Sequence, residues 1–387
     1  MKIAYVGPFS FPSSNANSLR VNGLAEALAM AGHEIQIVSA EKGTGCMAPT
    51  ETIHFHCVNE FESGFLAGLH RGLRGLFLGD ITLHWLQSLQ RKPDVIILYG
   101  THLGYLLRML FFCKKYGIPL FLDVVEWYDP RHLAGGLLGP FAIANELSMR
   151  FVAKRVSGMF TISRYLQEHF VKQGCRTLRV PPLFSSPQAR PQQFRESNQR
   201  LNLCYAGSPG KKEDMKSLFT GLQMACNAGI RFTMHIVGIT ADQFSADYRM
   251  RSLPIVRDNG FLKFYGRVDN AEARRIVASC DFMVLLRKNI RVAKAGFPSK
   301  VAESLSLGTP IIANLSSNLD EYLIDGENSI IVKKLEAEAF CDALRRVAKF
   351  GEHEYKKMQS HALDCSNTNF KVENHAAAIN EFIGALS

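Results

Sequence analysis

The 387-residue sequence lacks the short motifs of several common enzyme classes. No GxGxxG follows the first apolar run, which disfavours a nicotinamide-dependent dehydrogenase, and no Walker A pattern is present. No DxD triplet occurs, and no group of His, Cys, Asp and Glu has the spacing of metal ligands. We therefore expect neither a bound metal nor another cofactor, so any chemistry must rely on the protein's own charges and dipoles.

Two further absences concern location. No apolar run reaches the length that spans a bilayer, and the chain enters a strand at once without the pattern of a signal peptide. The nine cysteines show no CxxC and no regular spacing, which is typical of small buried hydrophobes in a reducing compartment. We expect a cytoplasmic protein, with the inner face of the cell membrane as a peripheral location.

The composition that is present indicates two globular domains. Hydrophobic residues make up 47% of the sequence, and the length suits two cores rather than one. The formal net charge of +10 is spread over both halves. An anionic substrate together with an anionic membrane surface would account for it. Nucleic acid is an alternative explanation of the positive charge, but we expect no nucleic-acid partner.

The stretch Arg291–Asn314 (RVAKAGFPSKVAESLSLGTPIIAN) has the clearest pattern. The apolar run Asp281–Leu286 before it predicts a buried strand, and a helix and a second strand follow a glycine loop. The residues that break or cap the chain are Gly296, Pro298, Ser299, Gly308 and Pro310. Free N–H groups at such a loop form an anion site, and the nearby Glu303 carboxylate suits sugar hydroxyls.

A second loop of this kind follows the predicted strand Leu201–Ala206. The loop Gly207–Asp214 (GSPGKKED) leads into a predicted helix that ends at Asn227. Lys211 and Lys212 place positive charge ahead of that helix, so the loop is a second candidate anion site. Solvated lysines beside a plain turn are the alternative.

The first half repeats the order strand, polar loop, helix. The predicted strands are Lys2–Val6, Glu34–Ser39, Ile53–Val58, Asp94–Tyr99, Ile118–Val124 and Gly158–Ser163. Polar side chains follow three of them and include Asn15, Asn17, His102, Glu126 and Asp129. Open α/β sheets bind ligands at these strand ends. An exposed loop residue or a helix cap is the alternative for each.

Two segments bear on organisation and partners. The segment Val180–Arg200 is rich in Pro, Ser and Gln and is interpreted as a linker. The segment Phe65–Leu78 (FLAGLHRGLRGLFL) places leucines on one helical face and its basic residues largely off that face. It predicts a helix that lies on a membrane surface, although a core-packed helix is the alternative and three glycines weaken the helix prediction.

Both glycine loops resemble those of retaining glycosyltransferases with the GT-B fold, of the family 4 type (group 1 glycosyltransferases). Gly296-Phe297 and the run Glu303–Ile312 (ESLSLGTPII) match the family's donor motif, and polysaccharide-type members with GFP[ST]K loops look most similar. The motif's first Glu is replaced by Ala295. In the family that Glu is associated with the donor sugar and the second Glu with the ribose, so the resemblance assigns Glu303 to the ribose.

The resemblance implies an α/β protein with two Rossmann-like parallel-sheet domains that face a central cleft. It implies an N-terminal acceptor domain over residues 1–185, a linker over 186–200, a C-terminal donor domain over 201–370 and a helix over 371–387 that returns to the first domain. The implied catalytic residues are Lys212, His102 and Glu126. The implied donor-binding residues are Lys211, Gly207, Arg267, Val268, Gly296, Phe297, Pro298, Ser299, Lys300 and Glu303. The implied acceptor-binding residues are Asn15, Asn17 and Asp129.

The implied reaction moves a hexose from a UDP- or GDP-sugar to a glycan or lipid-linked glycan in bacterial surface polysaccharide biosynthesis. Without a metal, lysines and helix N-termini would stabilise the leaving diphosphate. Retention would let the donor phosphate accept the acceptor's proton. Two alternatives stay open: a GT-B-fold protein that binds a nucleotide sugar or acts as a scaffold partner without transfer, and a nucleotide-sugar epimerase.

Overall fold

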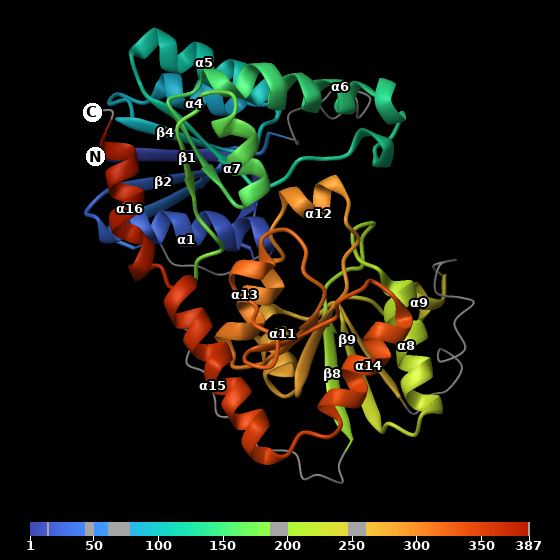
Figure 1. Cartoon of the computed structure of the whole chain (residues 1–387). Coiled ribbons are helices and arrows are strands. Elements are labelled where there is room, and N and C mark those ends of the chain that lie inside the picture. The colour runs from blue at the N-terminus through green and yellow to red at the C-terminus, as the bar shows by residue number, and fades with distance from the viewer. Residues whose placement is uncertain (14, 43–49, 61–77, 186–199, 247–260, 386–387) are drawn as a thin grey trace. The chain divides into compact units, whose positions relative to one another are not determined.

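The computed structural model describes residues 1–13, 15–42, 50–60, 78–185, 200–246 and 261–385. The chain divides into two compact units. The first unit comprises Met1–Ser185, Lys294–Phe297 and Lys371–Ser387, and the second comprises Ser186–Ala293 and Pro298–Phe370. Each unit contains one parallel sheet covered by helices (Figure 1).

The sheet of the first unit has the strand order β3-β2-β1-β4-β5-β6-β7. Its strands are β1 (Lys2–Phe11), β2 (Glu34–Lys42), β3 (Ile53–Cys57), β4 (Val95–Tyr99), β5 (Leu120–Val124), β6 (Gly158–Thr161) and β7 (Thr177–Arg179). All of these pairs are parallel. The order runs outward in one direction from β1 and in the other from β4, so the topological switch point lies between these two strands.

The helices of the first unit cover both faces of its sheet. They are α1 (Ala16–Met30), α4 (Asp80–Ser88), α5 (Leu103–Tyr116), α6 (Pro140–Leu147), a π-helix (Ser148–Val152), α7 (Arg164–Val171) and α16 (Glu373–Gly384), with 3-10 turns at Pro130–His132, Gly136–Leu138 and Ala153–Arg155. Figure 1 shows α1 and α16 on the opposite side of the sheet from α4 and α5. Phe382 of α16 packs against Phe121 and Phe160 of the sheet, with ring centroids 5.7 and 5.3 Å away. A segment that follows the second unit in sequence thus completes the first unit's core.

A buried ion pair joins α1 to the sheet near the switch point. Arg20 donates to both carboxylate oxygens of Asp123 and, through Nη1, to the carbonyls of Val180 and Pro181. Tyr5 donates to the same carboxylate at 2.6 Å. Burial and the Asp123 charge raise the pKa of the Tyr5 phenol, so it stays protonated as a donor. Because both charges are well satisfied, removal of either partner would leave a costly buried charge.

The second unit has a six-stranded parallel sheet with the order β10-β9-β8-β11-β12-β13. Its strands are β8 (Leu201–Ala206), β9 (Phe232–Val237), β10 (Leu262–Gly266), β11 (Phe282–Leu285), β12 (Ile311–Ala313) and β13 (Ser329–Ile331). Its helices are α8 (Met215–Asn227), α9 (Ala241–Ala246), α11 (Asn270–Ala278), α13 (Ser299–Ser306), α14 (Ala337–Val347) and α15 (Glu352–Asn369). The short helix α12 (Arg291–Ala295) stands where the chain passes between the units.

The predicted fold class, α/β with two Rossmann-like parallel-sheet domains, is confirmed. Strand β1 is longer than predicted, because Ser10 and Phe11 pair with Glu41 and Lys42 of β2 beyond an irregularity after Gly7. The prediction that Ser299 caps the following helix was wrong. Ser299 is the first residue of α13, and Pro298 holds the cap position without a side-chain hydrogen bond.

Two predictions concern segments that the structure does not describe in full. Residues 61–77 of the predicted membrane-surface helix Phe65–Leu78 and residues 186–199 of the predicted linker lie outside the described residues. Within the described part of the chain, no helix is both long enough and apolar enough to cross a membrane.

Candidate functional site

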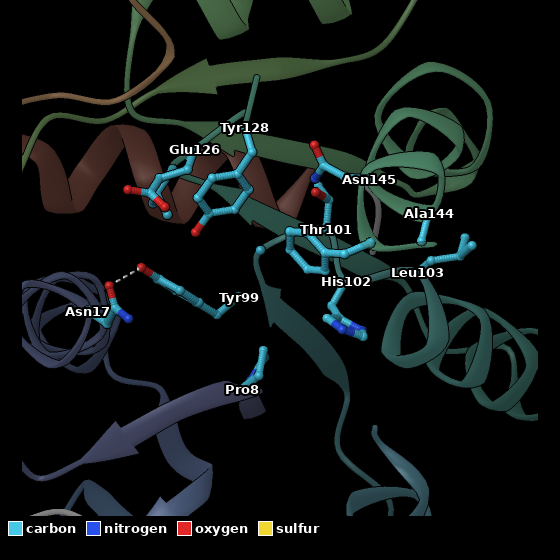
Figure 2. A pocket seen from close by; sticks show the side chains of 13 residues that line it. Pro8, Asn17, Tyr99, Thr101, His102, Leu103, Glu126, Tyr128, Ala144 and Asn145 are labelled. Carbon is cyan, nitrogen blue, oxygen red and sulfur yellow. Dashed lines mark hydrogen bonds between the residues drawn. The ribbon is translucent and has the colours of Figure 1, made fainter. Parts of the chain in front are cut away.

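A cavity of about 180 Å³ lies in the first unit at the carboxyl ends of β1, β4 and β5 (Figure 2). This is the switch point, where open parallel sheets bind ligands. Its polar lining is Asn17, Tyr99, Thr101, His102, Glu126, Tyr128 and Asn145, and its other lining residues are Pro8, Gly100, Leu103, Val125, Phe141 and Ala144. Such a mixture of a few polar groups and an apolar wall is typical of a small-molecule site.

One side of the cavity carries a cluster of hydrogen-bonding groups. Tyr99 donates its hydroxyl to Asn17 Oδ1 at 2.8 Å, and Figure 2 shows Glu126 and Tyr128 on the same side. Burial, the Glu126 charge and a hydrogen bond to Glu126 raise the pKa of Tyr128. Burial and then the charges of Asp123 and Glu126 raise the pKa of Tyr99. Two protonated phenols, an amide and a carboxylate suit a ligand rich in hydroxyl groups.

His102 stands on the opposite side of the lining, at the N-cap position of α5. Burial, assisted by the charge of Arg108, lowers its pKa to about 4. Its Nδ1 is buried and has no hydrogen-bond partner among the described residues. The ring is therefore neutral at physiological pH, and a buried polar atom of this kind is an expected contact for a bound ligand.

Two predicted acceptor residues have local structural contacts and do not line this cavity. Asp129 is buried and accepts from the backbone N–H and the guanidinium of Arg131, at 3.1 and 2.8 Å. Asn15 caps α1 by accepting from Ser18 N, and it donates to Ser10 Oγ. The structure thus brings Asn17, His102 and Glu126 together and places Asp129 and Asn15 outside the lining.

In the second unit, the β8–α8 loop begins at Gly207, whose φ of 143° favours glycine. A Cβ at this position would lie 2.5 Å from Cε of Lys300, and a Cβ at Gly238 would lie 2.7 Å from the Gly207 carbonyl. Just after β8 and β9, the backbones at Gly207 and Gly238 are therefore in close contact, with no side chain between them. The Lys300 side chain lies directly against this backbone and adds positive charge to it.

Backbone hydrogen bonds hold the rest of this loop against the segment after β11. The Lys212 carbonyl accepts from Lys288 N, and Asp214 N donates to the Leu286 carbonyl, both at 2.8 Å. Asp214 also caps α8 by accepting from Ser217 N. Lys211 is exposed and Lys212 half-buried. The two lysines thus precede a helix of thirteen residues whose N-terminus favours an anion.

Glu303 on α13 is the carboxylate of this unit's candidate site. Burial raises its pKa, and the charges of Lys300 and Arg274 oppose that rise. Lys300 is thus near both Glu303 and the Gly207 backbone. Arg274 comes from α11, and sequence reasoning did not single it out because nothing in the pattern of that helix distinguishes it from other surface arginines.

The remaining predicted donor residues lie in two loops. Arg267 and Val268 follow Gly266, which donates to the Ile239 carbonyl at 3.1 Å and so joins the ends of β9 and β10. Gly296, Phe297 and Pro298 are buried, and Ser299 is half-buried at the start of α13. Ala295 is fully buried, and its carbonyl accepts from Ser163 Oγ within the first unit.

Comparison with known families accounts for both units. Residues 18–183 match the family described as glycosyl transferase 4-like domain, and residues 199–349 match glycosyl transferases group 1. The chain is a glycosyltransferase with the GT-B fold. The sequence comparison with curated proteins found no match.

Solved structures share this glycosyltransferase's fold over its whole length. Sucrose-phosphate synthase from Thermosynechococcus elongatus superposes with a TM-score of 0.74 at 12% identity, covering 100% of this chain and 98% of that one. Anabaena HepE, solved in complex with UDP-glucose, has a TM-score of 0.69 at 14% identity and 100% coverage of both chains. WaaG, described as a glycosyltransferase involved in lipopolysaccharide biosynthesis, has a TM-score of 0.68 at 13% identity, covering 99% and 100%.

Proposed function

We propose that this glycosyltransferase moves a hexose from a UDP- or GDP-sugar to a glycan or lipid-linked glycan, with retention and without a metal. The observation that carries the proposal is the position of Lys300. It lies against the bare backbone at Gly207 and near the buried carboxylate of Glu303, so the proposed phosphate site and the proposed hydroxyl-binding carboxylate adjoin in one unit. HepE, which shares the fold, was solved with UDP-glucose.

The second unit would hold the donor. Glu303 would accept hydrogen bonds from the ribose hydroxyls, and Arg267 and Val268 would contact the base. Lys212, Lys211, Lys300 and the N-terminus of α8 would neutralise the diphosphate. Charge on the leaving diphosphate grows as the bond to the sugar breaks, so these fixed positive groups favour the transition state over the ground state.

The cavity in the first unit would hold the acceptor. Glu126 and Asn17 would orient acceptor hydroxyls, and neutral His102 would contact a sugar hydroxyl through its buried ring nitrogen. In a retaining transfer the acceptor oxygen attacks on the face that the diphosphate leaves. The donor phosphate then accepts the acceptor's proton, so no carboxylate need act as a general base.

The first test is a thermal-shift panel of nucleotide sugars against wild type and Glu303→Ala. A ligand at a hundred times its Kd adds about 2.7 kcal/mol to the free energy of unfolding, which is a readily measured shift. We expect one nucleotide class to shift wild type and to lose most of that effect in the variant. No shift with any UDP- or GDP-sugar would contradict the proposal.

A GT-B-fold protein that binds a nucleotide sugar without transferring it is the second candidate. Ala295 favours it, because this fully buried alanine stands where the resembling enzymes carry a donor-sugar Glu. Incubation of labelled donor with membranes separates the two candidates. Label that appears in a glycan or lipid fraction supports transfer, whereas tight binding without incorporation supports the binding protein.

A further inference from the structure

The exposed apolar side chains of the described residues are concentrated in one region of the first unit. Ten of the fifteen large hydrophobic residues with exposed side chains fall between Leu107 and Phe151. The most exposed are Leu138 at 85%, and Leu137 and Phe111 at 68% each. Single exposed hydrophobics are ordinary, but a concentration of this kind marks an interaction surface.

These residues follow the geometry of two neighbouring helices. Leu107 and Phe111 are four residues apart on α5, while Ile143, Leu147 and Phe151 are four apart along α6 and the π-helix. Residues four apart lie on one face of a helix. Helix α5 packs against both α6 and the π-helix (Figure 1). We call Phe111, Leu137, Leu138, Ile143, Leu147 and Phe151 the α5–α6 surface.

The same elements carry exposed positive charge. Helix α5 contains Arg108, Lys114 and Lys115 and no acidic residue, and Arg108 pairs with Asp80 of α4. Residues 129–155 carry Arg131, Arg150, Lys154 and Arg155 against Asp129 and Glu146, which form ion pairs with Arg131 and Arg150. Lys114, Lys115, Lys154 and Arg155 are exposed. Exposed aliphatic and aromatic side chains with lysines and arginines on the same helices are the combination that binds anionic lipid.

We propose that the α5–α6 surface docks on an anionic phospholipid bilayer. Phe111, Leu138 and Phe151 enter the boundary between headgroups and acyl chains, and Lys114 and Lys115 contact the anionic headgroups. Helix α6 also supplies Phe141, Ala144 and Asn145 to the cavity lining, so docking brings the cavity close to the lipid surface. The proposed surface shares no residue with the segment Phe65–Leu78, and it stands whether or not the transferase proposal holds.

The test is co-sedimentation of the full-length protein with vesicles, in the absence of any sugar donor. We expect binding to phosphatidylcholine–phosphatidylglycerol vesicles, weak binding to phosphatidylcholine alone and loss of binding as salt rises. Lys114→Glu with Lys115→Glu should lower the partition coefficient by about thirtyfold, since each basic residue near the surface contributes about fivefold. Phe111→Ser with Phe151→Ser should lower it by at least about tenfold.

Matched controls make the same chemical changes away from this surface. Val171→Ser with Ile324→Ser removes comparably exposed apolar side chains, and Lys333→Glu with Lys334→Glu reverses two adjacent exposed lysines. Both controls should bind vesicles like wild type. Thermal unfolding of every variant confirms that each is folded.

Hydrogen exchange of the wild-type protein gives a readout that needs no variant. Vesicles should slow exchange in α5 and over Leu137–Phe151. Slowing confined to other segments, including Phe65–Leu78, would overturn the proposal, as would wild type that fails to bind anionic vesicles. A dimer that the surface variants dissociate, without vesicle binding by wild type, would show that a second copy covers this surface instead.

Discussion

Glu303, the proposed ribose-binding residue, is a buried carboxyl group that lowers the stability of the fold at neutral pH. Burial favours the protonated carboxyl and raises its pKa, and the charges of Lys300 and Arg274 offset this only in part. The native state therefore binds this proton more tightly than the unfolded chain does. The contribution of Glu303 to the free energy of unfolding is therefore largest at acidic pH. It falls as the pH rises above the ordinary pKa of a glutamate side chain.

Glu303→Gln should accordingly raise the melting temperature at neutral pH, because the amide carries no charge into the buried site. The gain should shrink as the pH falls toward 4.5, where the wild-type carboxyl is increasingly protonated. Thermal unfolding of both proteins across this pH range measures the difference. A variant that is less stable than wild type at pH 7 would contradict this. It would show that the polar interactions of the Glu303 carboxylate stabilise the fold by more than the burial of its charge costs.

Glu303 and Lys212 should affect different kinetic constants. Loss of a charge-assisted hydrogen bond to the ribose costs roughly 1.5–3 kcal/mol in ground and transition states alike. Glu303→Ala should thus raise the donor KM by about ten- to a hundredfold with a modest change in kcat. Lys212→Ala should depress kcat on the order of a hundredfold, because charge grows on the diphosphate. The reverse pattern would indicate that Glu303 contacts the transferred sugar.

His102 should act as a neutral group throughout the physiological range. Its pKa of about 4 means that the ring gains a proton only near pH 4 and below, so it should add no inflection to the rate between pH 5.5 and 8. His102→Asn keeps a hydrogen-bonding side chain, and we expect its rate to be lower by a constant factor across that range. A wild-type inflection near pH 6.5 that disappears in His102→Asn would contradict the assignment.

At the scale of elements, the β8–α8 loop depends on the absence of a side chain at Gly207. An alanine there would be strained at a φ of 143°, and its Cβ would displace the end of Lys300. Gly207→Ala should therefore cost about 1 kcal/mol of stability and raise the donor KM. Gly229→Ala is the control, since φ is 79° and no atom lies within 4 Å of its Cβ. An equal donor KM for the two variants would indicate that Lys300 does not contribute to donor binding.

Sequence patterns located the elements whose boundaries are set locally. The bounds of β8 (Leu201–Ala206) and the end of α8 at Asn227 agree with the prediction. Elements defined by tertiary pairing were missed. Strand β7 is three half-buried residues that exist by pairing with β6, and the end of β1 depends on β2.

The candidate site shows the same limit. Asn17, His102 and Glu126 follow strand ends, so topology alone places them at one edge of the sheet. The same argument applies to Tyr99, which also stands at a strand end. It was assigned to the buried strand and not to the site, because it ends an apolar run. Phe141 and Asn145 come from α6, where no local signal indicates a cavity wall. Arg287, a large and fully buried side chain, was not singled out as a candidate site residue.

At the scale of the whole molecule, donor activation should need no divalent ion. The absence of a DxD triplet motivates this prediction, together with Lys212, Lys300 and the α8 N-terminus as alternative sources of positive charge. Transfer measured with a chelator should match transfer with added Mg²⁺ or Mn²⁺ to within about twofold. Activity that the chelator abolishes and a metal restores would reject the assignment of the diphosphate to these groups.

The position of α16 in the first unit's core has a consequence for how the protein is made. Synthesis releases the first sheet from the ribosome early, but Ile379, Phe382 and Ile383 emerge only after the whole second unit. Until then the face that they cover stays exposed to solvent. The nascent chain thus presents an apolar surface that can bind either its own later segment or a chaperone. A fragment of Met1–Ser185 should therefore aggregate during expression. Fusing Lys371–Ser387 behind it through a flexible linker should recover soluble protein.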